Sequence, residues 1–164
     1  MSVAARAAAG VAAKASAAMD VPVQERGSFL SRMQELLGVR RLRSEQDLVR
    51  LVEQRLPTQA LESFRRYGLT DDEIYGLVLP RRTLAHRRAR REALSREESD
   101  RVVRLARIAA LGEHVFGDRE RSWHWLRAGK RQFQGRSPIQ LVATEAGARL
   151  VEELLYRIDE GMAA

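Results

Sequence analysis

The sequence predicts an all-α fold, and three observations support this prediction. No segment of the 164 residues alternates apolar and polar side chains with the period of two expected of a half-buried strand. Apolar residues recur instead at helical spacing in one segment after another. The apolar content of 45% leans on Leu, Val and Ala, while aromatic residues make up only 5%, a balance that favours helices over sheets.

The first part of the chain contains three expected helices. Over residues 28–37 the apolar side chains fall on one helical face, and Gly38 ends the pattern. A second apolar stripe begins after Ser44, a potential N-cap, and stops at Pro57. A third helix is expected over residues 58–67.

Two capping boxes then fix where the next helices begin. Thr70 and Glu73 form the first box, and they predict a short helix from Asp71 to Val78. Ser95 and Glu98 form the second box, which opens the longest periodic segment of the chain.

The last part of the chain also contains clear helix signals. Ser137 before Pro138 is typical of an N-cap followed by proline in the first helical position. Glu152 and Glu153 are assigned to a solvated face of the final helix. Its inner face is expected to comprise Leu150, Val151, Leu154, Leu155 and Ile158.

These signals suggest three parts. Residues 1–27 are Ala-rich without the bulky apolar stretch of a secretory signal, so we expect a mostly disordered leader. Residues 28–116 form the expected N-terminal helical module, and residues 117–164 the C-terminal domain.

The strongest charge feature is a basic helix within the N-terminal module. The chain carries a net charge of +7, which favours a polyanionic partner. Six arginines and one histidine lie between Arg81 and Arg91, after the short helix and a tight turn. This arrangement predicts a helix-turn-helix at about residues 71–91, with the second helix in the major groove of operator double-stranded DNA. The expected DNA contacts are Arg81, Arg82, Thr83, Ala85, His86, Arg87, Arg90 and Arg91.

A simple alternative is that the basic helix is merely solvated. Acidic residues follow it closely, from Glu92 to Asp100, and can neutralise part of its charge. The preference for arginine over lysine can also reflect codon usage in a GC-rich genome. The turn at residues 78–80 lacks the glycine common in helix-turn-helix units.

The sequence offers no catalytic constellation, so we expect a protein that is not an enzyme and has no cofactor or metal. There is no cysteine, which suits a cytoplasmic protein, and the three histidines share no metal-binding spacing. No run of eighteen apolar residues could span a membrane. The pair Trp123 and Trp125 is expected to include one core anchor. Gly147, early in a helix, indicates close approach either by a partner or by another helix of this chain.

The C-terminal segment resembles a known family. The matching residues are GRSP at 135–138, TEAGA at 144–148 and the spacing Val151, Leu155, Ile158, Gly161. Together with PRRTLAHRR from Pro80, LSREESDRVVRLAR and VFGDRE upstream, they resemble the Xre/MbcA/ParS antitoxins, the partners of RES-domain toxins. The resemblance covers roughly residues 45–161. Just before GRSP this chain departs from the family's usual Asn and Gly–Gly pair, reading Lys130 and Gln134-Gly135.

The resemblance implies a C-terminal toxin-binding domain and a concrete function. Such antitoxins bind a RES toxin that destroys NAD, cover the entrance to its active site, and repress their own operon through the helix-turn-helix. A homodimer within a larger toxin–antitoxin complex is expected from the two-fold symmetry usual for such repressors. Two alternatives remain: a stand-alone helix-turn-helix regulator, or an antitoxin to an ADP-ribosylating toxin. The implied toxin contacts are Gly135, Arg136, Ser137, Pro138, Thr144, Glu145, Gly147, Arg149, Arg157, Glu160 and Gly161.

Overall fold

The computed structural model describes residues 23–161 of the chain, with side chains from residue 28 onward. No strand occurs in this range, so the all-α prediction is confirmed. The first helix begins inside the range expected for the leader, and residues 1–22 of that leader lie outside the described part. The elements are α2 (Val23–Leu37), α3 (Glu45–Gln54), α4 (Ala60–Tyr67), α5 (Asp71–Leu77), α6 (Arg81–Ala89), α7 (Arg96–Phe116), α8 (Arg119–Arg127), the 3₁₀ turn η1 (Arg131–Phe133), α9 (Pro138–Leu141) and α10 (Glu145–Asp159).

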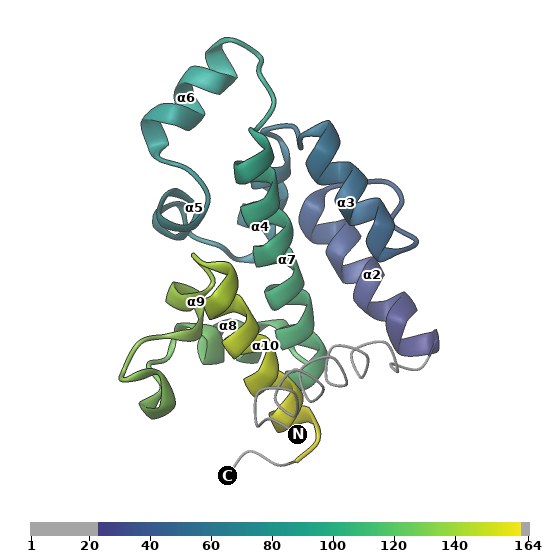
Figure 1. Cartoon of the computed structure of the whole chain (residues 1–164), viewed down its shortest axis with the longest axis vertical. Coiled ribbons are helices and arrows are strands. Elements are labelled where there is room, and N and C mark those ends of the chain that lie inside the picture. The colour runs from purple at the N-terminus through teal and green to yellow at the C-terminus, as the bar shows by residue number, and fades with distance from the viewer. Residues whose placement is uncertain (1–22, 162–164) are drawn as a thin grey trace, which may run out of the picture.

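The long helix α7 runs through the middle of the molecule and organises the other helices around it (Figure 1). α2 and α3 pack against it on one side, and α8 and α10 pack against its C-terminal half. α6 lies at one end of the molecule, while α8, α9 and α10 lie toward the other (Figure 1). The basic helix and the C-terminal segment are therefore well separated surfaces of one body.

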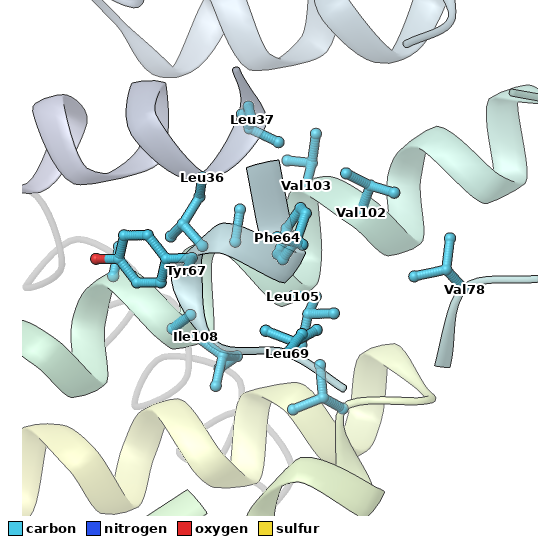
Figure 2. Close-up of a cluster of buried hydrophobic side chains, with 14 of the residues drawn as sticks. Leu36, Leu37, Phe64, Tyr67, Leu69, Val78, Val102, Val103, Leu105 and Ile108 are labelled. Atoms are coloured by element: carbon cyan, nitrogen blue, oxygen red, sulfur yellow. The ribbon is translucent and has the colours of Figure 1, made fainter. Parts of the chain in front are cut away.

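One continuous hydrophobic core joins the two parts of the chain. Phe64 of α4, Val103 of α7 and Leu36 of α2 are among its buried side chains (Figure 2). Both ends of α7 contribute to this core, because Val102 and Ala110 are fully buried.

The helix starts follow the predicted capping chemistry. The Thr70 hydroxyl accepts a bond from the Glu73 N–H at 3.2 Å, and the Glu73 carboxylate accepts from the Thr70 N–H at 2.8 Å. Ser95 and Glu98 form the same reciprocal pair. Both capping boxes are confirmed, since each satisfies two backbone donors that a helix start leaves unpaired.

Two expectations for α10 were wrong. Leu150, assigned to the inner face, is 51% exposed, because the neighbouring helices do not cover the edge of that broad apolar face. Glu152, assigned to a solvated face, is largely covered and forms an ion pair with Arg107 Nε at 2.7 Å. Burial raises the pKa of Glu152, although the Arg107 guanidinium opposes that shift.

No helix within the described residues is long and apolar enough to cross a membrane. That part of the chain also contains no group of three or more His, Cys, Asp or Glu side chains that could hold a metal ion.

Candidate functional site

One apolar side chain of the basic helix α6 packs into the body of the protein. Leu84 is 2% exposed and is the buried residue of this helix. Leu79, in the turn before it, is also buried, while Pro80 occupies the N-cap with φ −58°. The turn between α5 and α6 is therefore closed by a buried leucine and a proline, where related units often use glycine.

The structure brings most of the predicted DNA contacts to one exposed helix and turn. Thr83 and Arg87 are only partly exposed. The exposed members are Arg81, Arg82, Ala85, His86, Arg90 and Arg91.

Arg87 is engaged inside the chain. Its Nε lies 2.8 Å from Glu98 Oε2, and its side chain is 21% exposed. One guanidinium N–H also donates to the Ala93 carbonyl at 3.2 Å. These contacts join α6 to the start of α7, so much of the charge of Arg87 is neutralised within the protein.

Arg88 is engaged in the same way, through an ion pair and hydrogen bond with Glu62 of α4. The Glu62 carboxylate also accepts a bond from Arg65 at 2.6 Å. Within residues 23–161, the side chains of Arg81 and Arg82 at the start of α6 and of Arg90 and Arg91 after it form no ion pair or hydrogen bond.

The GRSP segment forms a closed turn before α9. The Lys130 N–H donates to the Arg136 carbonyl at 3.0 Å, and the Gly135 N–H donates to the Lys130 carbonyl at 2.9 Å. Gly135 and Arg136 are exposed. Ser137 and Pro138 are buried. They start α9, where the Ser137 N–H donates to Gln140 Oε1 at 3.0 Å within a capping box.

The TEAGA segment starts α10 and explains its glycine. The Thr144 hydroxyl accepts a bond from the Gly147 N–H at 3.1 Å. A Cβ added to Gly147 would lie 2.8 Å from the Leu141 carbonyl carbon and 3.0 Å from Thr144 Oγ1. Close approach within the chain therefore accounts for Gly147, which is itself buried and offers little surface to a partner.

The remaining predicted toxin contacts are exposed on the turns around α10 and along it. Glu145 lies within a cluster of guanidinium groups, 3.1 Å from Arg104 and 3.3 Å from Arg149. Partial burial acts to raise the pKa of Glu145, but the neighbouring arginines hold it below its ordinary value. The exposed members are Thr144, Glu145, Arg149, Arg157, Glu160 and Gly161.

The tryptophan pair behaves as expected, with one member in the core. Trp123 is 5% exposed, and its indole N–H donates to the Tyr67 carbonyl at 2.9 Å. Trp125 is partly exposed, packs on Phe116 with a ring separation of 5.4 Å, and has the Lys130 ammonium 4.7 Å from its ring centroid.

Helix α8 connects the C-terminal segment to the helix-turn-helix. Arg127 Nε lies 2.7 Å from Glu73 on α5, and the same guanidinium donates to the Gly68 carbonyl at 2.7 Å. Burial of the carboxyl acts to raise the pKa of Glu73, but the Arg127 pair and the cap bond to Thr70 hold it below its ordinary value. The first helix of the helix-turn-helix is thus fixed on the C-terminal part of the chain.

Comparison with known proteins matches both parts of this architecture. Residues 47–107 match the family model described as the antitoxin Xre-like helix-turn-helix domain. Residues 111–161 match the antitoxin Xre/MbcA/ParS C-terminal toxin-binding domain. An antitoxin Xre of Pseudomonas putida is 35% identical over 134 residues, which cover 81% of this chain and 84% of the relative. The chain belongs to the Xre family of antitoxins. An antitoxin Xre of Yersinia enterocolitica is 32% identical over 85 residues, which cover 51% of this chain and 57% of the relative.

Membership of this family confirms the predicted order of a helix-turn-helix domain followed by a C-terminal antitoxin domain. The two domains imply a toxin partner and DNA. The matched regions meet within α7, so this one helix belongs to both. The individual DNA and toxin contacts stay predictions.

Sequence reasoning missed one feature of the toxin-binding domain. Leu150 lies at one edge of an apolar face of five positions, which is as wide as the stripe of an ordinary surface helix. The sequence therefore carries no signal that this edge is left exposed.

Proposed function

We propose that this Xre-family antitoxin binds and inhibits a RES-domain toxin that degrades NAD, and that it represses its own operon by binding the operator. The observation that carries the proposal is the pairing of a helix-turn-helix domain and a toxin-binding domain in one chain. The resemblance of the GRSP and TEAGA segments to the partners of RES toxins supports the choice of toxin.

The toxin-facing surface that we propose is one face of α10. Residues four and seven positions apart share a helical face, so Ala146, Leu150 and Arg157 are aligned. All three are exposed, and Leu150 is the most exposed large apolar side chain of this helix. A half-exposed leucine in line with an arginine offers a partner both apolar contact area and hydrogen-bond donors.

The DNA-facing surface that we propose is the first turn of α6 together with the turn that follows this helix. Arg81 and Arg82 stand where recognition helices contact base edges, and Arg90 and Arg91 stand where they can contact phosphates. One bidentate arginine–guanine pair contributes about 1–3 kcal/mol of discrimination between bases. A homodimer would place two such helices on the half-sites of a palindromic operator.

A stand-alone regulator is the other candidate function, and the match of residues 111–161 to a toxin-binding domain favours the antitoxin over it. A regulator without a toxin partner should bury its C-terminal aromatic residues internally or in a homodimer. Of the four aromatic residues in this segment, Trp123 is buried, Trp125 and Phe133 are only partly covered, and Tyr156 is 38% exposed. Together with Leu150, the last three side chains leave apolar surface for a partner.

Co-expression with the neighbouring gene tests the proposal. The neighbour alone should arrest growth, and this chain should restore it. Leu150→Glu should lose the rescue without unfolding the protein, because the side chain is already half exposed. Val49→Glu is the matched control, since Val49 is 58% exposed on α3. Normal growth with the neighbour alone would refute the antitoxin function, and arrest without NAD loss would point to a different toxin activity, such as ADP-ribosylation.

A further inference from the structure

Three helical elements within the described residues are followed by a non-glycine residue with positive φ: Gln134 follows η1, and arginines follow α3 and α6. Most helix ends with a positive φ use glycine, as left-handed backbone requires. Gly38, Gly68, Gly117 and Gly161 follow α2, α4, α7 and α10 in this way. The positions after α3 and α6 instead hold Arg55, with φ 64°, and Arg91, with φ 55°.

Arginine at these positions is unfavourable for the backbone. A side chain with a Cβ rarely adopts positive φ, because the Cβ approaches the following carbonyl oxygen. Arg55 is the more unusual of the two, since its ψ of 120° lies outside the left-handed helical region. Residues held in such conformations concentrate at functional sites, where the surrounding structure enforces them.

Backbone hydrogen bonds hold the two segments that carry these arginines against each other. Leu56 is buried, and its N–H donates to the buried Ser99 hydroxyl at 2.9 Å. Its carbonyl accepts a bond from the Leu94 N–H at 2.9 Å. This pair of bonds holds the segment after α3 against the segment after α6, so Arg55 and Arg91 lie next to two fixed points.

Arg55 and Arg91 are both exposed, the first directly after α3 and the second two residues after α6. Neither guanidinium has an ion pair or hydrogen bond within residues 23–161, although Glu97 lies near enough to sense the charge of Arg55. Arg55 is one residue from Leu56, and Arg91 is three residues from Leu94. Because Leu56 and Leu94 are joined by a hydrogen bond, the Cα atoms of Arg55 and Arg91 are at most about 20 Å apart. One turn of duplex DNA spans about 34 Å, so a single duplex can reach both.

We infer that Arg55 and Arg91 form a phosphate clamp that extends the DNA-binding surface beyond α6. The clamp contacts the DNA backbone and does not read the base sequence. Both of its arginines adopt unfavourable backbone conformations to reach the phosphates. Arg91 thereby acts as a backbone contact, and Arg55 enlarges the interface onto the segment between α3 and α4. This inference rests on the proposed DNA binding.

The test uses the full chain and two fluorescent 30-base-pair duplexes, one from immediately upstream of its coding sequence and one of mixed sequence. Affinity is measured by anisotropy from about 50 to 200 mM salt. The double variant Arg55→Gly/Arg91→Gly should lower the slope of log affinity against log salt by about two on both duplexes, because each lost phosphate contact removes about 0.9. At about 0.1 M salt the affinity should fall roughly 50-fold.

The same variant separates a binding role from a structural one. Glycine relieves the strain at both positions, so the melting temperature should stay equal or rise. Arg55→Lys/Arg91→Lys should keep the salt slope, since the charge is retained. Arg121→Gln is the matched control, because this arginine is exposed on α8 away from α3 and α6, and it should leave binding unchanged.

An unchanged salt slope in the glycine variant would overturn the clamp, and a clearly lower melting temperature would overturn the strain argument. Arg81→Gln/Arg82→Gln keeps the two proposals apart. If this variant loses affinity while the glycine variant does not, only the clamp fails. If the wild-type chain binds neither duplex at the lowest salt, the proposed DNA binding fails and the clamp fails with it.

Discussion

Replacing Gly147 with alanine should destabilise the protein through a contact inside the chain. Gly147 lies in the first turn of α10, directly above the end of α9. A Cβ at this position would overlap the Leu141 carbonyl oxygen and lie 2.8 Å from the Leu141 carbonyl carbon. These are backbone atoms, so they cannot rotate away as the end of a flexible side chain would.

The magnitude follows from two opposing effects. Alanine in a helix is favoured over glycine by up to about 1 kcal/mol. Forcing a methyl group against packed backbone costs about 1–3 kcal/mol, occasionally more. Here the carbonyl also cannot shift freely, because Thr144 caps α10 from the same turn, with its hydroxyl 3.1 Å from the Gly147 nitrogen. We therefore expect a net loss of about 2 kcal/mol, or a melting temperature lowered by roughly 4–8 °C for a chain of this size.

Thermal unfolding followed by circular dichroism measures this effect, and Gly76→Ala is the matched control. Gly76 also lies in a helix, but a Cβ there would meet nothing within 4 Å. The control should therefore be neutral or stabilising by up to about 1 kcal/mol. A Gly147→Ala protein as stable as the wild type, yet unable to bind the toxin, would refute this reasoning and assign the glycine to the partner interface.

Two further predictions concern ion pairs that join helices. The Glu113 carboxylate accepts a hydrogen bond from the Tyr67 hydroxyl and pairs with Arg119 at 3.1 Å. Burial acts to raise the pKa of Glu113, but these two partners hold it below its ordinary value of 4.5. Such a carboxylate contributes stability above its unfolded pKa and loses it as pH falls through the lower folded pKa. Glu113→Gln should therefore have a lower free energy of unfolding in urea than the wild type at neutral pH. This difference should shrink below about pH 4.5. A difference that grows in acid would contradict the ion pair. Arg87→Ala should cost about 1–3 kcal/mol, because it leaves the largely buried Glu98 carboxylate without its cation. Equal stability of Arg87→Ala and the wild type would show that Arg87 is available to DNA.

Local features of the fold could be predicted from the sequence because their chemistry is local. Thr70 and Glu73 are three residues apart, and their reciprocal bonds need no knowledge of the rest of the chain. The same holds for Ser137 before Pro138 at the start of α9. The family resemblance also rests on short segments that can be read directly.

Features that depend on distant neighbours could not be predicted. Whether Leu150 is covered depends on which helices pack beside α10. Arg87 and Glu98 are eleven residues apart and meet only because α6 folds back beside the start of α7. Glu152 is covered because Arg107 of α7 reaches it. Nor does any sequence pattern reveal that Arg55 adopts a positive φ, since the bonds that hold Leu56 come from residues some forty positions away.

The central claim is that one chain neutralises an NAD-degrading toxin through α10 and binds DNA through the opposite end. The most direct test is the NAD concentration in cells that express the neighbouring gene with different forms of this chain. We predict that NAD collapses with the neighbour alone and is preserved by the wild type and by Arg81→Gln/Arg82→Gln. It should collapse again with Leu150→Glu. Undiminished NAD in cells that express the neighbour alone would contradict the account.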